Sequence, residues 1–183
     1  MADPFSIVII TGSPTRPSRS AGLAQHVEQR LTREAFAVRT VHVRDLPATA
    51  LLHADFNDPG IASASELVAK ADGVVVASPV YKAAYTGVLK AFLDLLPQFA
   101  LRGKVVLPLL TGGSVAHVLA LDYAVRPVLQ SLDPRLVVGG LFVLDKSITV
   151  EAEGSVKIDP EVTPRLEQVT QTFIDGLHCI HSL

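Results

Sequence analysis

One short segment near the start, TGSPTRPSRS at positions 11–20, places hydroxyl and guanidinium groups directly after an apolar run. Its candidate donors are Ser13, Ser18, Ser20, Arg16 and Arg19. A loop that leads into a helix also presents free backbone N–H groups at the positive end of the helix dipole. This combination predicts a cradle for one phosphate monoester. The alternative is an ordinary loop whose serines cap the helix that follows.

The spacing of the glycines excludes two common nucleotide sites. The sequence has no G-x-x-x-x-G-K-[ST] motif, and no G-x-G-x-x-G follows the first apolar run. A nucleoside triphosphatase loop and a dinucleotide site of the usual kind therefore do not fit.

Two further segments have the composition of ligand-binding loops. SPVYKAAYTG at 78–87 follows a wholly apolar run, and the backbone of Pro79, Val80 and Tyr81 could contact a flat ring. TGGSVAH at 111–117 could hydrogen-bond the polar edge of such a ring. The residues for this second role are Thr111, Gly112, Gly113 and Ser114. The alternatives are tyrosines that cover a sheet end and a tight turn that caps a helix.

The elements that must position these loops alternate along the chain. Continuous apolar or β-branched runs predict strands at 6–11, 37–44, 73–78, 104–110 and 136–144. Helical spacing predicts helices at 21–33, 62–71, 87–96, 115–132 and 160–180. Strict alternation favours a doubly wound α/β sheet, in which ligands lie beyond the carboxyl ends of the strands. Pro127 falls inside the fourth helix and predicts an irregular turn near 121–126.

The composition is that of one globular domain spanning residues 1–183. About half of the residues, 49%, are apolar, and the net charge of −2 gives no footprint for nucleic acid or an anionic membrane. The single cysteine, Cys179, excludes an internal disulfide and a cysteine-rich metal site, and we expect no metal. The start has no basic region before its apolar run and no run long enough for a membrane span, so we expect a cytoplasmic protein.

Taken together, four segments resemble the NADPH-dependent FMN reductase family. They are GSPTRPSRS, SPVYKAAYTGVLKAFLDLLP, LRGKVVLPLLTGGSVAH and LDYAVRPVL, and the resemblance runs from Ile7 to about Leu144. It implies a flavodoxin-like, five-stranded parallel sheet of order 2-1-3-4-5 flanked by helices. One departure is that Thr15 stands where the family commonly has Arg, and Arg16 follows it.

The resemblance also implies which residues bind the flavin. It assigns the FMN phosphate to Ser13, Ser18, Arg19 and Ser20. It assigns the isoalloxazine ring to Pro79, Val80, Tyr81, Thr111, Gly112, Gly113 and Ser114. Since the flavin carries the chemistry, no side chain is assigned as catalytic.

The activity that the resemblance implies is reduction of FMN by NADPH, with NADH possible, through hydride transfer from nicotinamide C4 to flavin N5. The alkanesulfonate branch of the family implies a role in sulfur assimilation, with reduced flavin passed to a flavin-dependent sulfonate monooxygenase. It further implies a homodimer or homotetramer, with Tyr123 at the oligomer interface near the flavin.

Three other functions stay open at this point. The first is a quinone, azo or metal-ion reductase that retains its FMN. The second is a flavodoxin-like electron carrier without catalytic activity, although carriers are strongly acidic and this chain has a charge of only −2. The third is a site for some other phosphomonoester.

Overall fold

The computed structural model describes residues 5–151 and 155–181. Its centre is a parallel sheet of order β2-β1-β3-β5-β6, with β7 also paired to β5. The strands are Ser6–Thr11 (β1), Ala37–His42 (β2), Gly73–Tyr81 (β3), Val105–Gly112 (β5), Leu136–Val137 (β6) and Leu141–Leu144 (β7). When β6 and β7 are counted as the one strand predicted at 136–144, the order is the predicted 2-1-3-4-5. The flavodoxin-like fold is thus confirmed.

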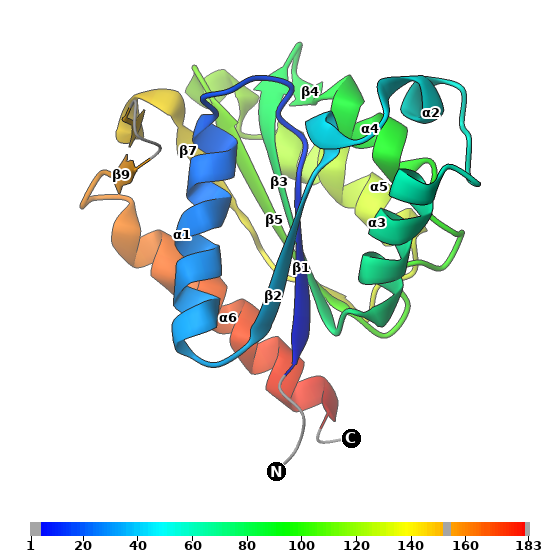
Figure 1. Cartoon of the computed structure of the whole chain (residues 1–183). Helices are drawn as coiled ribbons and strands as arrows, with labels where there is room; N and C mark the ends of the chain where they lie inside the picture. The colour runs from blue at the N-terminus through cyan, green and yellow to red at the C-terminus, as the bar shows by residue number, and fades with distance from the viewer. Residues whose placement is uncertain (1–4, 152–154, 182–183) are drawn as a thin grey trace.

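Helices cover both faces of the sheet, as Figure 1 shows. Arg19–Arg33 (α1) and Thr163–His181 (α6) lie on one side, and Pro59–Lys70 (α3), Gly87–Leu93 (α4) and Arg126–Ser131 (α5) lie on the other. The short helix Ala48–Leu52 (α2) lies near α4. Successive strand residues alternate between two apolar layers: Ile7 and Ile9 pack on the α1 side, and Val8 and Ile10 on the α3 side. Within the described residues, no helix combines the length and apolarity that crossing a membrane requires.

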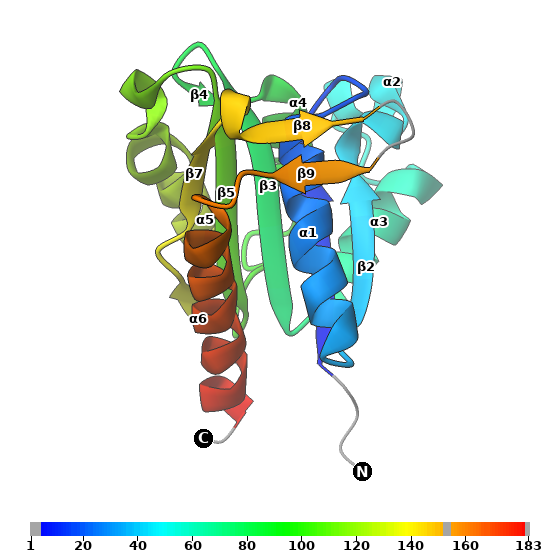
Figure 2. The ribbon, with the colours of Figure 1, turned by 90° about the vertical axis from the view of Figure 1, so that its left-hand side faces the viewer.

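Two short antiparallel strand pairs were not predicted. Ala84–Tyr85 (β4) folds back antiparallel on β3, and Ile148–Val150 (β8) pairs with Val156–Ile158 (β9) as a separate two-stranded sheet. Figure 2 shows β8 and β9 running across the molecule to α1, which both contact. Strands of two or three residues carry too little alternation to be recognised in a sequence.

The strand predicted at 136–144 is interrupted, which corrects that prediction. Gly139 and Gly140 separate β6 from β7, and Gly140 has φ +76°. A Cβ atom at Gly140 would lie only 2.5 Å from the carbonyl oxygen of Pro108, so the chain can bend here only with glycine.

The helix predicted at 115–132 is also wrong as one continuous helix. The structure has a 3₁₀ turn at Val115–His117, a π-helix at Leu121–Val125, and then α5. The irregular turn predicted near 121–126 is confirmed. Pro127 occupies the first turn of α5, directly after the π-helix.

Other boundaries shift by a few residues. β2 ends at His42 in place of residue 44, because a 3₁₀ turn at Val43–Asp45 follows, and α4 ends at Leu93 in place of residue 96. In contrast, α3 begins earlier than predicted, at Pro59, because the Asp58 side chain accepts the N–H groups of Gly60 and Ile61 and caps the helix.

Candidate active site

The three loops chosen from the sequence open at the same edge of the sheet. β1, β3 and β5 are parallel neighbours, and their register places Thr11 beside Ala77 and Pro79 beside Thr111. The loops that follow these strands therefore emerge together, at the top of the molecule in Figure 1. This is the position at which doubly wound sheets bind ligands.

In the first loop, the serine hydroxyls gather at the start of α1. Ser18 is the N-cap: its Oγ accepts the Ala21 N–H at 3.2 Å and lies 3.2 Å from the Oγ of Ser20. Ser13 and Ser20 are buried, and the Oγ of Ser13 has only long contacts of 3.5 Å with the backbone of Thr15. Ser18 thus caps a helix as the alternative reading supposed, while Ser13 and Ser20 retain hydroxyl capacity for a ligand.

The two arginines of this loop are engaged with neighbouring segments. Arg19 Nε donates to the carbonyl oxygen of Ile148 at 3.3 Å, and Arg16 forms an ion pair with Asp45. The bond to Ile148 uses only the Nε of Arg19, so the guanidinium keeps its charge near the serine cluster. The backbone N–H groups at the start of α1, to which Arg19 contributes as its first residue, add the positive end of the helix dipole.

Thr86 joins the first loop to the second and is not among the residues predicted from the sequence. Its buried hydroxyl donates to the carbonyl oxygen of Gly12 and accepts the Leu89 N–H at 3.1 Å, so it also caps α4. The Thr86 N–H donates to the Oγ of Ser78 at 3.1 Å. The available signal was a threonine directly before a helical pattern, which is an N-cap signature.

The second loop is a tight hairpin between β3 and β4. Tyr81 pairs with Ala84, so Lys82 and Ala83 form a two-residue turn with φ +51° and +65°. Val80 is buried, Pro79 is half-buried, and the side chain of Tyr81 is exposed. The hairpin therefore presents an aromatic ring and a stretch of backbone at the edge of the sheet.

The third loop contains a buried hydroxyl without a partner. Thr111 is fully buried, and its Oγ1 accepts and donates no hydrogen bond. Gly112 is buried, whereas Gly113 and Ser114 are exposed, and the Oγ of Ser114 accepts the Ala116 N–H at 3.2 Å. Leaving a buried hydroxyl unsatisfied costs about 1–3 kcal/mol, which a polar ligand edge at this loop would recover.

Comparison with known proteins agrees with this arrangement. The sequence pattern of the NADPH-dependent FMN reductase family matches residues 5–149. The chain belongs to this family. It is 41% identical over 172 residues to an FMN reductase (NADPH) of Escherichia coli (strain K12), covering 94% of this chain and 90% of the relative. It is 44% identical over 169 residues to an FMN reductase (NADPH) of Pseudomonas putida strain KT2440, covering 91% and 85%.

A solved structure supports the same assignment. The apo form of an NADH:FMN oxidoreductase superimposes with a TM-score of 0.84 at 45% identity, covering 92% of this chain and 88% of the other. As a member of the FMN reductase family, the chain is an oxidoreductase that uses FMN and reduced nicotinamide.

One surface segment of this FMN reductase, from Val115 to Tyr123, exposes several apolar side chains. We call it the apolar patch, and it consists of Val115, Val118, Leu119 and Tyr123. All are exposed, Tyr123 most of all at 79%. The apolar patch follows the third loop directly and continues into the π-helix. π-Helical turns occur frequently at functional sites.

Proposed function

We propose that this FMN reductase supplies reduced flavin to a flavin-dependent sulfonate monooxygenase, with hydride passing from nicotinamide C4 to flavin N5. The main support for a flavin site is the buried hydroxyl of Thr111, which has no partner and lies in register beside Pro79. A flavin ring bound between the second and third loops would supply that partner. The sulfonate partner is supported by the LDYAVRP segment around Tyr123, which resembles the alkanesulfonate branch and here forms a π-helix.

The proposed site divides into two parts. The phosphate of FMN is held by Ser13, Ser18, Ser20 and the backbone N–H of Arg19, at the positive end of α1. The ring lies against the Pro79–Tyr81 backbone and the Thr111–Ser114 turn. When bound, FMN supplies the hydride-accepting centre.

The chain itself positions the two ring systems and provides hydrogen-bond donors. Backbone N–H groups of the loops stabilise the negative charge that develops on the reduced ring, and stacking of the two ring systems aligns the reacting atoms. No side chain has to act as an acid, a base or a nucleophile.

The first experiment separates a reductase that uses FMN as a substrate from one that retains it. Purified protein is assayed for NADPH oxidation in air, with increasing free FMN and with NADH in parallel. Saturation with FMN, and a negligible rate without it, supports the proposal. A yellow protein that needs no added FMN, and accelerates only with a quinone, would be a bound-flavin reductase. FMN binding without nicotinamide oxidation would indicate an electron carrier.

A second experiment tests the partner. The reductase is combined with a flavin-dependent alkanesulfonate monooxygenase, and sulfite released per NADPH oxidised is compared with that from an unrelated flavin reductase adjusted to the same FMN reduction rate. Free reduced flavin is lost to oxygen in both mixtures. A higher sulfite yield with this chain supports the partnership, and equal yields contradict it.

We further propose that the protein is cytoplasmic and forms a homodimer or homotetramer through the apolar patch. Four apolar side chains exposed together on one segment are the support for an interface.

A further inference from the structure

A cavity of about 600 Å³ lies over α1, between β2 on one side and β8 and β9 on the other. Arg16 and Ser18 of the first loop line its upper end, and Thr40, His42 and Arg44 line the side formed by β2 and the 3₁₀ turn after it. Ser18 is the only residue that it shares with the proposed FMN site. Cavities of this size accommodate small organic ligands.

The wall formed by β2 and the 3₁₀ turn after it carries hydrogen-bonding groups that have no partner in the protein. The Oγ1 of Thr40 and the Nε of Arg44 are buried and have no hydrogen-bond partner. Arg44 is held in place because its Nη1 donates to the carbonyl oxygen of Thr15 at 2.8 Å, while its Nε is 3.8 Å from the nearest carboxylate oxygen of Asp45. A guanidinium N–H that is fixed, buried and unpaired is suited to an anion.

His42 stands between these two donors. Its Nδ1 is 2.7 Å from the Oγ1 of Thr11, which leaves Nε2 as the ring nitrogen that a ligand can approach. Burial and then the charge of Arg44 lower the pKa of His42, so the ring is neutral in the free protein.

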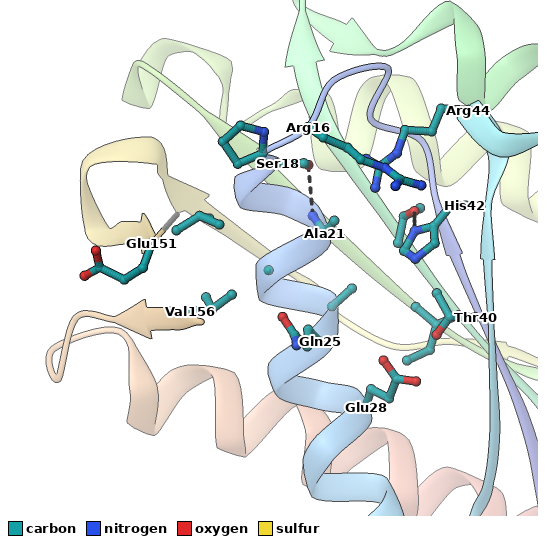
Figure 3. A pocket seen from close by; sticks show the side chains of 16 residues that line it. Arg16, Ser18, Ala21, Gln25, Glu28, Thr40, His42, Arg44, Glu151 and Val156 are labelled. Carbon is teal, nitrogen blue, oxygen red and sulfur yellow. Dashed lines mark hydrogen bonds between the residues drawn. The ribbon is translucent and has the colours of Figure 1, made fainter. Parts of the chain in front are cut away.

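Charge is distributed unevenly along the cavity. Figure 3 shows Arg16 and Arg44 at the upper end, Thr40 and His42 below them, and Glu28 at the lower end. Asp45 neutralises one of the two arginines, which leaves one positive charge at the upper end. Glu151, on the β8 side of the cavity, is paired with Lys157 at 3.0 Å. The carboxylate of Glu28 at the lower end disfavours a second anionic group and favours hydroxyl donors.

We propose that this cavity binds a nucleoside phosphate, independently of the FMN site. The phosphate is held by Arg44, Thr40 and His42, and the ribose hydroxyls donate to Glu28. Carboxylates are common partners of ribose hydroxyls in nucleotide sites. Binding of a free nucleotide would not depend on the flavin chemistry, whereas binding of the reduced nicotinamide rests on the proposed function. The ligand is either a free nucleotide or the adenosine phosphate end of the reduced nicotinamide, because both present the same groups.

The test is calorimetric titration of 5′-AMP into protein saturated with FMN, with inorganic phosphate as the smaller probe. We expect saturable binding that persists with FMN bound and is weaker for phosphate alone. Arg44→Gln should weaken 5′-AMP binding about tenfold or more, and Thr40→Val about fivefold. Thr40→Val should also raise the melting temperature, because it removes a buried hydroxyl that lacks a partner.

Arg39→Gln is the matched control. Arg39 precedes Thr40 on the same strand, is exposed, and does not line the cavity, so the variant removes an equal charge without touching the site. It should bind 5′-AMP like the parent. If Arg44→Gln fails to fold because its bond to Thr15 is lost, Thr40→Val carries the test alone.

Several results would overturn the proposal. They are the absence of saturable 5′-AMP binding, binding that disappears when FMN is added, and binding that Thr40→Val and Arg44→Gln leave unchanged. Steady-state kinetics then distinguish the two sources. A raised KM for reduced nicotinamide with unchanged kcat in Arg44→Gln indicates the adenosine end of the dinucleotide. An unchanged KM alongside lost 5′-AMP binding indicates a free nucleotide.

Discussion

At the scale of single residues, the buried hydroxyls of Ser13 and Ser20 give the most direct test of the proposed FMN site. Replacing both with alanine should weaken FMN binding by about 1–3 kcal/mol, because hydrogen bonds to a charged phosphate are lost. The measurement is quenching of FMN fluorescence on binding. Ser63→Ala, on the exposed surface of α3, is the control and should bind like the parent. A folded double variant with the parent's affinity would remove the serines from the site.

His42 gives a second residue-scale prediction, which concerns pH. Its pKa is lowered by burial and by Arg44, and Arg16 acts in the same direction, while Asp45 and Glu28 oppose them. The unfolded chain therefore takes up this proton first as the pH falls below 6.5, and the folded state loses stability from that point down to the lowered pKa.

His42→Asn should remove this contribution, because the asparagine amide can still reach Thr11 but does not titrate. The measurement is urea unfolding at pH 7.5 and pH 5.5. We expect the parent to lose more free energy of unfolding on acidification than the variant. Equal losses would mean that His42 ionises in the folded protein as easily as in the unfolded chain.

At the scale of elements, the β3–β4 turn carries backbone strain. Ala83 has φ +65°, which costs a residue with a Cβ about 1 kcal/mol relative to glycine. Ala83→Gly should therefore stabilise the protein by up to about 1 kcal/mol, measured by denaturant unfolding. Ala84→Gly is the control: Ala84 is paired with Tyr81 in a strand and lacks a positive φ, so this variant should destabilise. If Ala83→Gly also destabilises, the turn is not strained.

The elements also show what the sequence could predict. Runs such as GVVVAS at 73–78 identified the central strands because strands covered on both faces are continuously apolar, and parallel pairing then placed all three loops at one edge. The contacts of Arg16 and Arg19 could not be foreseen, since Asp45 and Ile148 approach them only through the tertiary fold. The buried Thr40 hydroxyl and Arg44 Nε that line the cavity over α1 could not be predicted either, because burial without a partner depends on the tertiary fold.

The prediction of one helix over 115–132 is wrong for a specific reason. Its apolar residues have helical spacing, which predicts one amphipathic helix. In the structure, Val115, Val118 and Leu119 face outward. Helical spacing of apolar residues indicates a face that is buried in the functional protein. It does not indicate whether that face packs on the core of its own chain or on another subunit.

At the scale of the whole molecule, that exposed face predicts self-association. Tyr123→Arg places a charge in the apolar patch and should convert the parent assembly to a smaller one, because burying an unpaired charge in an interface opposes association. The measurement is the molar mass by light scattering during gel filtration, at matched concentrations. Leu52→Arg is the control, since Leu52 on α2 is as exposed as Tyr123, at 79%, but lies outside the apolar patch.

Assembly and flavin binding should be linked, because Gly113 and Ser114 of the third loop run directly into Val115 of the apolar patch. An interface that orders this segment also fixes the turn beside the unpartnered hydroxyl of Thr111. Tyr123→Arg should therefore weaken FMN binding as well as reduce the mass, and raising the protein concentration should restore both together. A parent protein that is already monomeric, or a smaller assembly with full FMN affinity, would separate the apolar patch from the flavin site.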